Sequence, residues 1–261
     1  MKKLIILFAA TCLFAACDKN ENADFIAQYF FGGDKDPDAP NKGDEKKPTD
    51  NLPQTGLVAY YPFEGNANDI SGNDLNGEFR GGIFMTSSRK SDAYACGFTG
   101  VSNTYVQVPY SSALRLNNFT INAWAYNLSP SRGDGTIIQR GKRDNVGAFS
   151  LEYNHLYITD SEKSNYRVPL FDNEDEQPTS REWHMFTVTV QENLVAVYLD
   201  GHSMVYGRMN APYKCSITDD LHIGISDFST TTDAPFYGYI DDIRIYNRVL
   251  SQTEINALYK E

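Results

Sequence analysis

One pattern dominates the chain between residues 57 and 246. Short stretches in which apolar and polar residues alternate are separated by turns. In FTINAWAY, one face would carry Phe119, Ile121, Ala123 and Ala125, and the other Trp124 and Tyr126. A period of two residues is the period of a β-strand. Strands never alternate with helical patterns here, so the sequence predicts an all-β protein, a two-sheet antiparallel sandwich.

Local signals place two hairpins and one helix. The turn Gln191-Glu192-Asn193 separates two β-rich stretches, and Asp200-Gly201 is a typical two-residue hairpin turn. Near the end, Ser251 followed three residues later by Glu254 is a capping box, which opens a short helix with the sequence QTEINALYK.

The N-terminus has the pattern of an export signal. Lys2 and Lys3 precede the apolar run LIILFAATCLFAA, which ends in small residues before Cys17. The run is too short for an ordinary transmembrane span. Its end resembles a bacterial lipoprotein signal, which implies cleavage before Cys17 and lipidation of that residue. Phe14 departs from the Leu that is usual there, and ordinary secretion is the alternative.

Composition divides the remaining chain. Residues 18–54 are rich in Pro, Gly, Asp and Lys and cannot form a core, so we expect a flexible linker. Residues 55–261 would form a single domain. The net charge of −11 argues against nucleic acid and anionic membrane surfaces as partners, and leaves a lipid anchor as the expected membrane contact.

Two cysteines remain after removal of the signal and lipidation of Cys17. Cys96 and Cys215 would meet oxidising surroundings outside the cell, where such pairs often form a disulfide. Two buried thiols are the alternative.

Four stretches together resemble the laminin G-like, concanavalin A-like jelly-roll family. They are GLVAYYPFEGNANDISGNDLNG, YVQVPYSSALRLNNFTINAWAY, EWHMFTVTV with VYLDG, and FYGYIDDIRIYNRVLSQTEINALY, and they follow one another between residues 56 and 259. The resemblance implies a jelly roll, frequently with one calcium ion on its rim and often with carbohydrate binding.

A polar loop follows the first expected strand. Oxygen-bearing side chains crowd this loop, at Glu64, Asn66, Asn68, Asp69, Asn73 and Asp74. Calcium prefers such oxygens, although the spacing is not that of an EF-hand. Jelly-roll topology would bring the last strand, with Asp241 and Asp242, beside this loop. We therefore expect a structural calcium site formed by Glu64, Asn66, Asp69, Asn73, Asp241 and Asp242. The alternatives are an ordinary hydrogen-bonded turn and pairing of Asp242 with Arg244.

No catalytic constellation is evident. Glucanases of this fold carry three carboxylates on one strand, in an E-x-D-x-x-E or E-x-D-x-E pattern, which this sequence lacks. The four histidines are scattered, with no metal-binding or nucleophile motif. We therefore expect no enzyme activity, with glycoside hydrolysis as the weakest alternative.

Aromatic side chains are the expected contacts for a sugar. Trp124 and Trp183 fall at core positions of the family, so packing is the expectation for both. Better ligand candidates are Tyr110, Tyr153, Tyr166, Tyr206 and Tyr237, among which the sequence does not choose. The expected protein is an exported lipoprotein of the outer membrane or cell surface that binds a glycan. The rival is a structural or protein-interaction module of a surface assembly.

Overall fold

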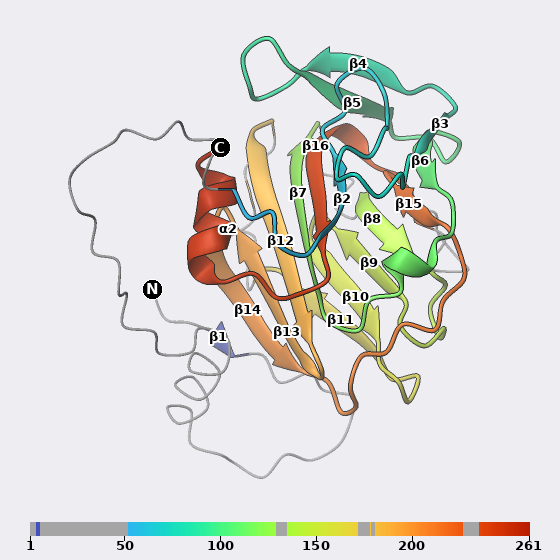
Figure 1. Cartoon of the computed structure of the whole chain (residues 1–261), viewed down its shortest axis with the longest axis vertical. Coiled ribbons are helices and arrows are strands. Elements are labelled where there is room, and N and C mark those ends of the chain that lie inside the picture. Colours follow the sequence, from blue (N-terminus) through green and yellow to red (C-terminus); the bar gives the residue numbers. More distant parts are fainter. Residues whose placement is uncertain (1–3, 6–51, 129–134, 172–177, 179–180, 227–234) are drawn as a thin grey trace, which may run out of the picture.

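The computed structural model describes residues 4–5, 52–128, 135–171, 178, 181–226 and 235–261. Two sheets face each other, as the alternating pattern predicts (Figure 1). Within these residues helix is confined to the short 3-10 turn η2 (Ser112–Leu114) and to α2 (Gln252–Tyr259). The expected all-β sandwich with a short C-terminal helix is confirmed.

The larger sheet contains the first and last strands of the sandwich. Its order is β14 (His202–Arg208), β13 (Leu194–Leu199), β12 (Trp183–Gln191), β7 (Phe119–Asn127), β16 (Tyr237–Tyr246), β5 (Tyr94–Thr99) and β4 (Phe84–Ser87). β2 (Leu57–Tyr61) pairs antiparallel with β16, as expected for a jelly roll, and the two-residue β1 (Leu4–Ile5) pairs parallel with β14.

The smaller sheet is antiparallel throughout. Its order is β11 (Asn165–Pro169), β10 (His155–Thr159), β9 (Phe149–Glu152), β8 (Thr136–Arg140), β15 (Leu221–Ile223), β6 (Tyr105–Val108) and β3 (Glu78–Arg80). The main core lies between the sheets. It receives the inward residues of β7 (Phe119, Ile121, Ala123 and Ala125), so the predicted alternation is confirmed.

The outer face of the larger sheet has a second, smaller core under α2. Ile255 and Leu258 of the helix are buried there with Trp124, Met185 and Tyr198. The capping box forms as predicted, because Ser251 Oγ accepts the Glu254 N–H and the Glu254 carboxylate accepts the Ser251 N–H. Both predicted hairpins also form, and the residues of the β13–β14 turn, Asp200 and Gly201, have φ angles of 51° and 76°.

Apart from residues 4–5 and 52–54, the expected signal (1–17), Cys17 and the linker (18–54) lie outside the described residues. No helix in the described parts of the chain has the length and apolar character needed to cross a bilayer.

The expected disulfide does not form in the structure. Cys96 and Cys215 are both free, buried thiols. Cys96 lies in β5 near Asp241, whereas Cys215 lies before β15, with its Sγ 3.9 Å from Nη1 of Arg140. The chemistry of the exported environment predicts that a pair would oxidise, but it does not place the two thiols together.

Candidate functional site

The polar loop after β2 is organised by one carboxylate. Asp69 is 8% exposed and accepts hydrogen bonds from the backbone N–H groups of Tyr60 (2.9 Å), Ser71 (2.8 Å) and Leu75 (3.1 Å). The Ser71 hydroxyl donates to it as well, at 2.9 Å. Four donors therefore already use the oxygens of the residue that the sequence suggests as a ligand.

The other predicted ligands of this loop point in different directions. Asn66 Oδ1 accepts the Asn68 N–H, and Asn73 Nδ2 donates to the Val58 carbonyl. The Glu64 carboxylate reaches away from the loop and accepts the backbone N–H of Tyr94 at 3.0 Å. Each side chain thus holds a separate piece of backbone.

Asp241 and Asp242 lie at a β-bulge in β16. The register with β7 shifts between Asp241 and Arg244, and Asp242 has a φ of 47°. An extra residue in one strand lets successive side chains serve the same side of a sheet. Both aspartates are 1% exposed, so their charges need partners inside the protein.

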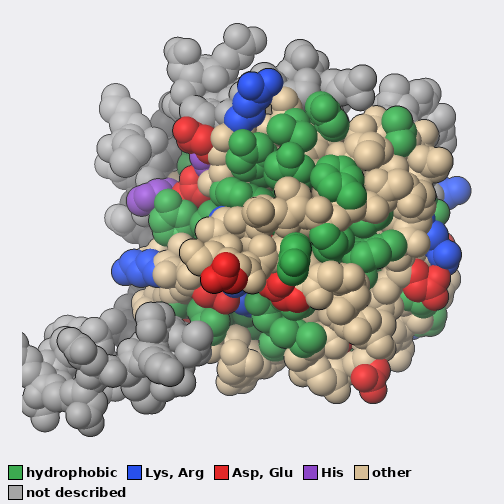
Figure 2. All heavy atoms as spheres, turned by 90° about the horizontal axis from the view of Figure 1, so that it is seen from above, with side chains coloured by type: hydrophobic (Ala, Val, Ile, Leu, Met, Phe, Trp, Pro, Cys, Tyr) green, Lys and Arg blue, Asp and Glu red, His purple; other side chains and the backbone are tan. Residues whose placement is uncertain are grey.

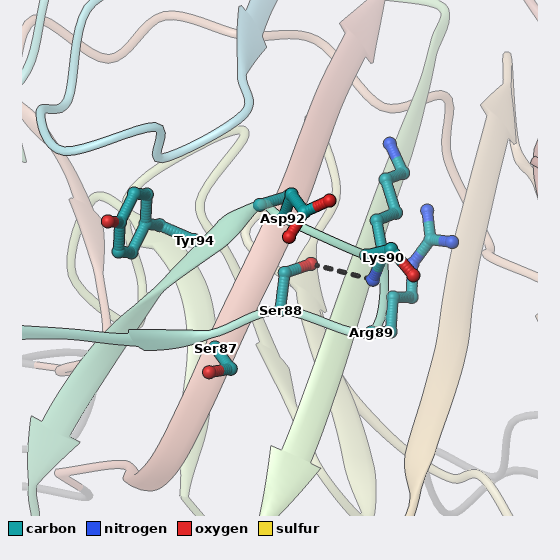
Figure 3. Close-up of a pocket in the computed structure, with 8 residues that line it drawn as sticks. Ser87, Ser88, Arg89, Lys90, Asp92 and Tyr94 are labelled. Carbon is teal, nitrogen blue, oxygen red and sulfur yellow. Dashed lines mark hydrogen bonds between the residues drawn. The ribbon is translucent and has the colours of Figure 1, made fainter.

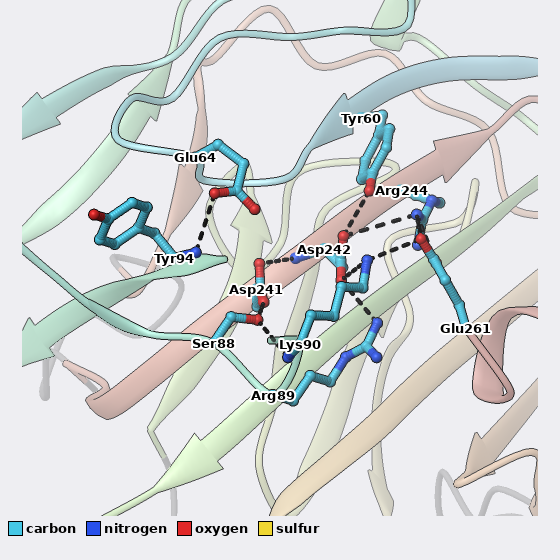
Figure 4. A network of polar contacts seen from close by, with 10 residues as sticks. All are labelled: Tyr60, Glu64, Ser88, Arg89, Lys90, Tyr94, Asp241, Asp242, Arg244 and Glu261. Atoms are coloured by element: carbon cyan, nitrogen blue, oxygen red, sulfur yellow. Dashed lines mark hydrogen bonds and ion pairs between the residues drawn. The ribbon is translucent and has the colours of Figure 1, made fainter. Parts of the chain in front are cut away.

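Those partners come from the turn between β4 and β5, from β2 and from β16 itself (Figure 4). Asp242 Oδ2 lies 2.8 Å from Arg89 Nη2 and 2.7 Å from Lys90 Nζ. Its Oδ1 accepts the Tyr60 hydroxyl at 2.6 Å. Lys90 and Arg244 also pair with Glu261, at 2.8 Å and 2.7 Å.

The two adjacent carboxyls have opposite pKa shifts. Burial and the negative charge of Asp242 raise the pKa of Asp241 to about 7. Burial alone would also raise the pKa of Asp242, but the positive charges of Arg244 and Lys90 hold it below its usual range. Asp241 accepts the hydroxyl of Ser88 and the N–H of Asp242.

The six residues expected to bind calcium therefore do not form one ligand set in this structure. Calcium requires six to eight converging oxygens. Among the described residues no three His, Cys, Asp or Glu side chains are grouped so that they could hold a metal. Tyr60 connects the polar loop to β16 instead, since its N–H donates to Asp69 and its hydroxyl donates to Asp242. This donor set does not fit a calcium ion as arranged, and calcium binding stays a prediction.

A polar hollow of about 570 Å³ lies at the turn between β4 and β5, lined by residues 87–94 (Figure 3). Ser88 Oγ accepts the backbone N–H of Lys90 there, at 3.2 Å. The cationic groups of Arg89 and Lys90 are held by Asp242, so both side chains attach the turn to β16. We therefore regard this hollow as part of the cluster of charged residues around Asp242.

Four aromatic rings form a line across the outer face of the larger sheet, and we call them the aromatic row: Phe84, Tyr239, Tyr126 and Trp183. The register makes this line continuous, because Phe84 and Tyr239 both pair with Gly97, Tyr239 pairs with Tyr126, and Tyr126 with Trp183. Successive ring centroids are 6.3, 5.2 and 5.6 Å apart.

The aromatic row remains accessible. Phe84 is 43% exposed, and the other three rings are half-buried. Figure 2 shows a different side, the end of the sandwich where β4 and β5 lie, and there too hydrophobic side chains are exposed, with a few charged groups among them. Exposed apolar groups arranged as in the aromatic row are typical of a binding surface.

The predicted aromatic candidates divide between core and surface. Tyr153, Tyr166 and Tyr206 are buried, whereas Tyr110 and Tyr237 are exposed. Trp124 is buried as expected, although under α2. Trp183 is half-buried and packs against the second core, as expected, while its ring also contacts Tyr126 in the row. Alternation places Trp183 and Tyr126 on outer faces, but only the pairing of distant strands aligns them.

Comparison with known proteins identifies the fold. A family model described as the concanavalin A-like lectin/glucanases superfamily matches residues 99–256. The sandwich itself begins earlier, at β2. No curated protein matches the sequence.

Solved structures share the architecture at low identity. Domain 4 of AbnA, a GH43 extracellular arabinanase from Geobacillus stearothermophilus in complex with arabinotriose, has a TM-score of 0.63 and 20% identity, over 78% of this chain and 98% of that one. The binding domain of Paraclostridial Mosquitocidal Protein 1 has a TM-score of 0.64 and 18% identity, over 79% of this chain and 52% of that one. The receptor binding domain of botulinum neurotoxin C/D mosaic serotype has a TM-score of 0.64 and 17% identity, over 80% of this chain and 52% of that one. This chain spans about half of the two toxin domains, and such identities show the fold alone.

Proposed function

Because this chain belongs to the concanavalin A-like lectin/glucanases superfamily, we propose that its sandwich is a non-catalytic carbohydrate-binding module. The aromatic row carries the proposal. Sugars present flat C–H faces between their hydroxyls, and a partly exposed ring offers a matching apolar face. Tyr126 and Tyr239 add a hydroxyl to such a face, and binding sites typically combine aromatic walls with a few polar groups.

The family name also covers glucanases, so hydrolysis is the competing activity. Glycosidases need one carboxyl free to donate a proton and another facing it across the substrate. The close carboxyl pair described here, Asp241 and Asp242, is buried. Asp242 is held by Arg89 and Lys90, and Asp241 by Ser88. This arrangement supports binding over hydrolysis.

We further propose that the module is exported and held at the outer membrane or cell surface by a lipid on Cys17. The linker of residues 18–54 would then separate the sandwich from the membrane. The pattern of the first seventeen residues supports this proposal. A protein-interaction module of a surface assembly remains the second candidate, supported by the toxin binding domains of the same fold.

A broad glycan array probed with the purified chain tests the function. We expect binding to a small set of related glycans, without release of reducing sugar on prolonged incubation. If the chain binds no glycan on the array and affinity capture recovers a defined protein partner, carbohydrate binding is refuted and the interaction module is favoured.

A further inference from the structure

We propose that the aromatic row is the sugar-binding surface, and that it takes a neutral, unbranched polysaccharide chain lying across the strands. This inference rests on the proposed function and adds the place, the shape and the charge of the ligand.

Gly97 makes the row continuous across β5. A Cβ at this position would lie 2.5 Å from the ring of Phe84, so the ring occupies the place of the missing side chain. Phe84 thereby comes within 6.3 Å of Tyr239, although β5 lies between their strands. With strands about 4.8 Å apart, the row from β4 to β12 spans about 19 Å. This length suits several consecutive sugar units.

The row is one ring wide on the side of α2. The next outward position on β7 is Trp124, which is 6% exposed. Tyr259 of α2 stacks on its ring, with centroids 5.7 Å apart and planes at 9°. The Arg89 guanidinium lies 4.0 Å from its centre. A branch toward α2 would collide with these groups, so the row favours an unbranched chain.

The charges beside the row are balanced. The row itself contains no charged residue, and the cations Arg89, Lys90 and Arg244 are held by Asp242 and Glu261. At the Trp183 end, exposed Arg181 is followed by exposed Glu182. An acidic sugar would therefore meet no net positive charge here, and it would approach a chain with a net charge of −11. Both facts favour a neutral ligand.

The area of the row alone is too small for a protein interface. A fully buried aromatic side chain covers roughly 150–250 Å². Four rings, of which the most exposed, Phe84, is 43% accessible, offer about 430 Å² at most. A stable protein interface needs about 800 Å² on each partner. The row alone is large enough for a sugar chain but would supply only part of a protein interface.

Fluorescence tests the position of the ligand, because the chain has only two tryptophans, Trp124 and Trp183. Titration with a glycan found on the array should change the tryptophan emission of the wild type. The change should persist in Trp124→Phe and disappear in Trp183→Phe. The reverse result, or a change unaffected by either variant, would place the ligand elsewhere.

Affinity measurements test the contribution of the rings. We expect Tyr239→Ala to weaken binding about two- to tenfold, in line with a single aromatic contact. Phe84→Ala, on the edge strand, should act similarly and guards against a Tyr239 variant that fails to fold. Tyr110→Ala is the matched control, since Tyr110 is 40% exposed and lies beside Arg140, away from the row.

Matched ligands test shape and charge. For neutral, unbranched oligosaccharides of one linkage, affinity should rise with length and then level off. Carboxylated or sulfated chains of equal length should bind at least about tenfold more weakly. If the wild type binds a glycan and the row variants bind it equally, or if acidic chains bind best, this inference fails and the proposed function stands. If the wild type binds no glycan, both fail.

Discussion

Asp241 and Asp242 are neighbours in the sequence, yet they differ in charge. Asp242 faces three cationic side chains, whereas Asp241 faces the Ser88 hydroxyl, a backbone N–H and the carboxylate beside it. A pKa near 7 means that Asp241 holds its proton over much of the weakly acidic range. The stability of the fold should therefore depend on pH through this residue.

Folding raises the pKa of Asp241 from its ordinary value of 3.8 to about 7. Between these values the folded chain keeps a proton that the unfolded chain has released, so the free energy of unfolding falls as pH rises through this window. Asp241→Asn should remove this loss. We expect its melting temperature, relative to wild type, to be higher at pH 8 than at pH 5.

The control is Asp92→Asn, an exposed residue in the turn between β4 and β5. Its melting temperature should follow that of the wild type at every pH. A difference between Asp241→Asn and wild type that stays constant from pH 5 to pH 8 would contradict the assigned protonation.

The alternation in YIDDIRIY predicts that one carboxylate of the Asp241-Asp242 pair is buried beside apolar residues and needs a partner. It names Arg244 as the alternative partner of Asp242, and Arg244 Nη2 does lie 3.7 Å from Asp242 Oδ1. Ser88, Arg89 and Lys90 could not be foreseen, because they lie some 150 positions away and approach only through the β5–β16 pairing.

Among the elements, the polar loop after β2 is the one whose composition is best explained by its structure. Its Asn, Asp and Ser side chains replace the regular backbone pairing that an irregular corner lacks. Asp69 binds both to β2, through Tyr60, and to the far end of the loop, through Leu75. This carboxylate therefore fixes the loop against the sandwich.

Asp69→Ala should destabilise the protein by about 3 kcal/mol, because it leaves buried N–H donors without an acceptor. Asn68→Ala, at an exposed position of the same loop, should change stability by less than about 0.5 kcal/mol. Urea denaturation measures both. Equal effects of the two substitutions would show that the loop does not depend on Asp69.

Elements that depend on local signals were predictable. The two hairpins and the capped helix α2 each follow from a few adjacent residues, such as Asp200-Gly201 and Ser251 with Glu254. The aromatic row was not predictable in this way. Its alignment requires the register of five strands at once, and register between distant strands is set by the whole core.

For the whole molecule, thermal melting with a chelator and with a reductant tests two expectations together. The carboxylate oxygens of Asp69 and Asp242 are occupied by donors, and Cys96 and Cys215 are free. We therefore expect dithiothreitol to leave the melting temperature unchanged. EDTA tests the calcium prediction, because the hydrogen-bonded corner seen in the structure would melt at the same temperature with or without the chelator.

Ligand binding to the native state must raise stability. A lower melting temperature with EDTA, restored by added calcium, would establish a structural calcium ion. A lower temperature with dithiothreitol would establish a disulfide. Cys215→Ser should then melt like the reduced wild type.

The place of β16 in the larger sheet has a consequence for how the molecule is made. β16 pairs with β7, β5 and β2, yet it is the last strand in the sequence. A growing chain therefore lacks the strand that joins the two halves of this sheet until residue 246 has been added. Contacts between such distant segments slow folding. We expect the sandwich to stay open until β16 has been synthesised, and an unfolded chain is the state in which a polypeptide can be threaded across a membrane.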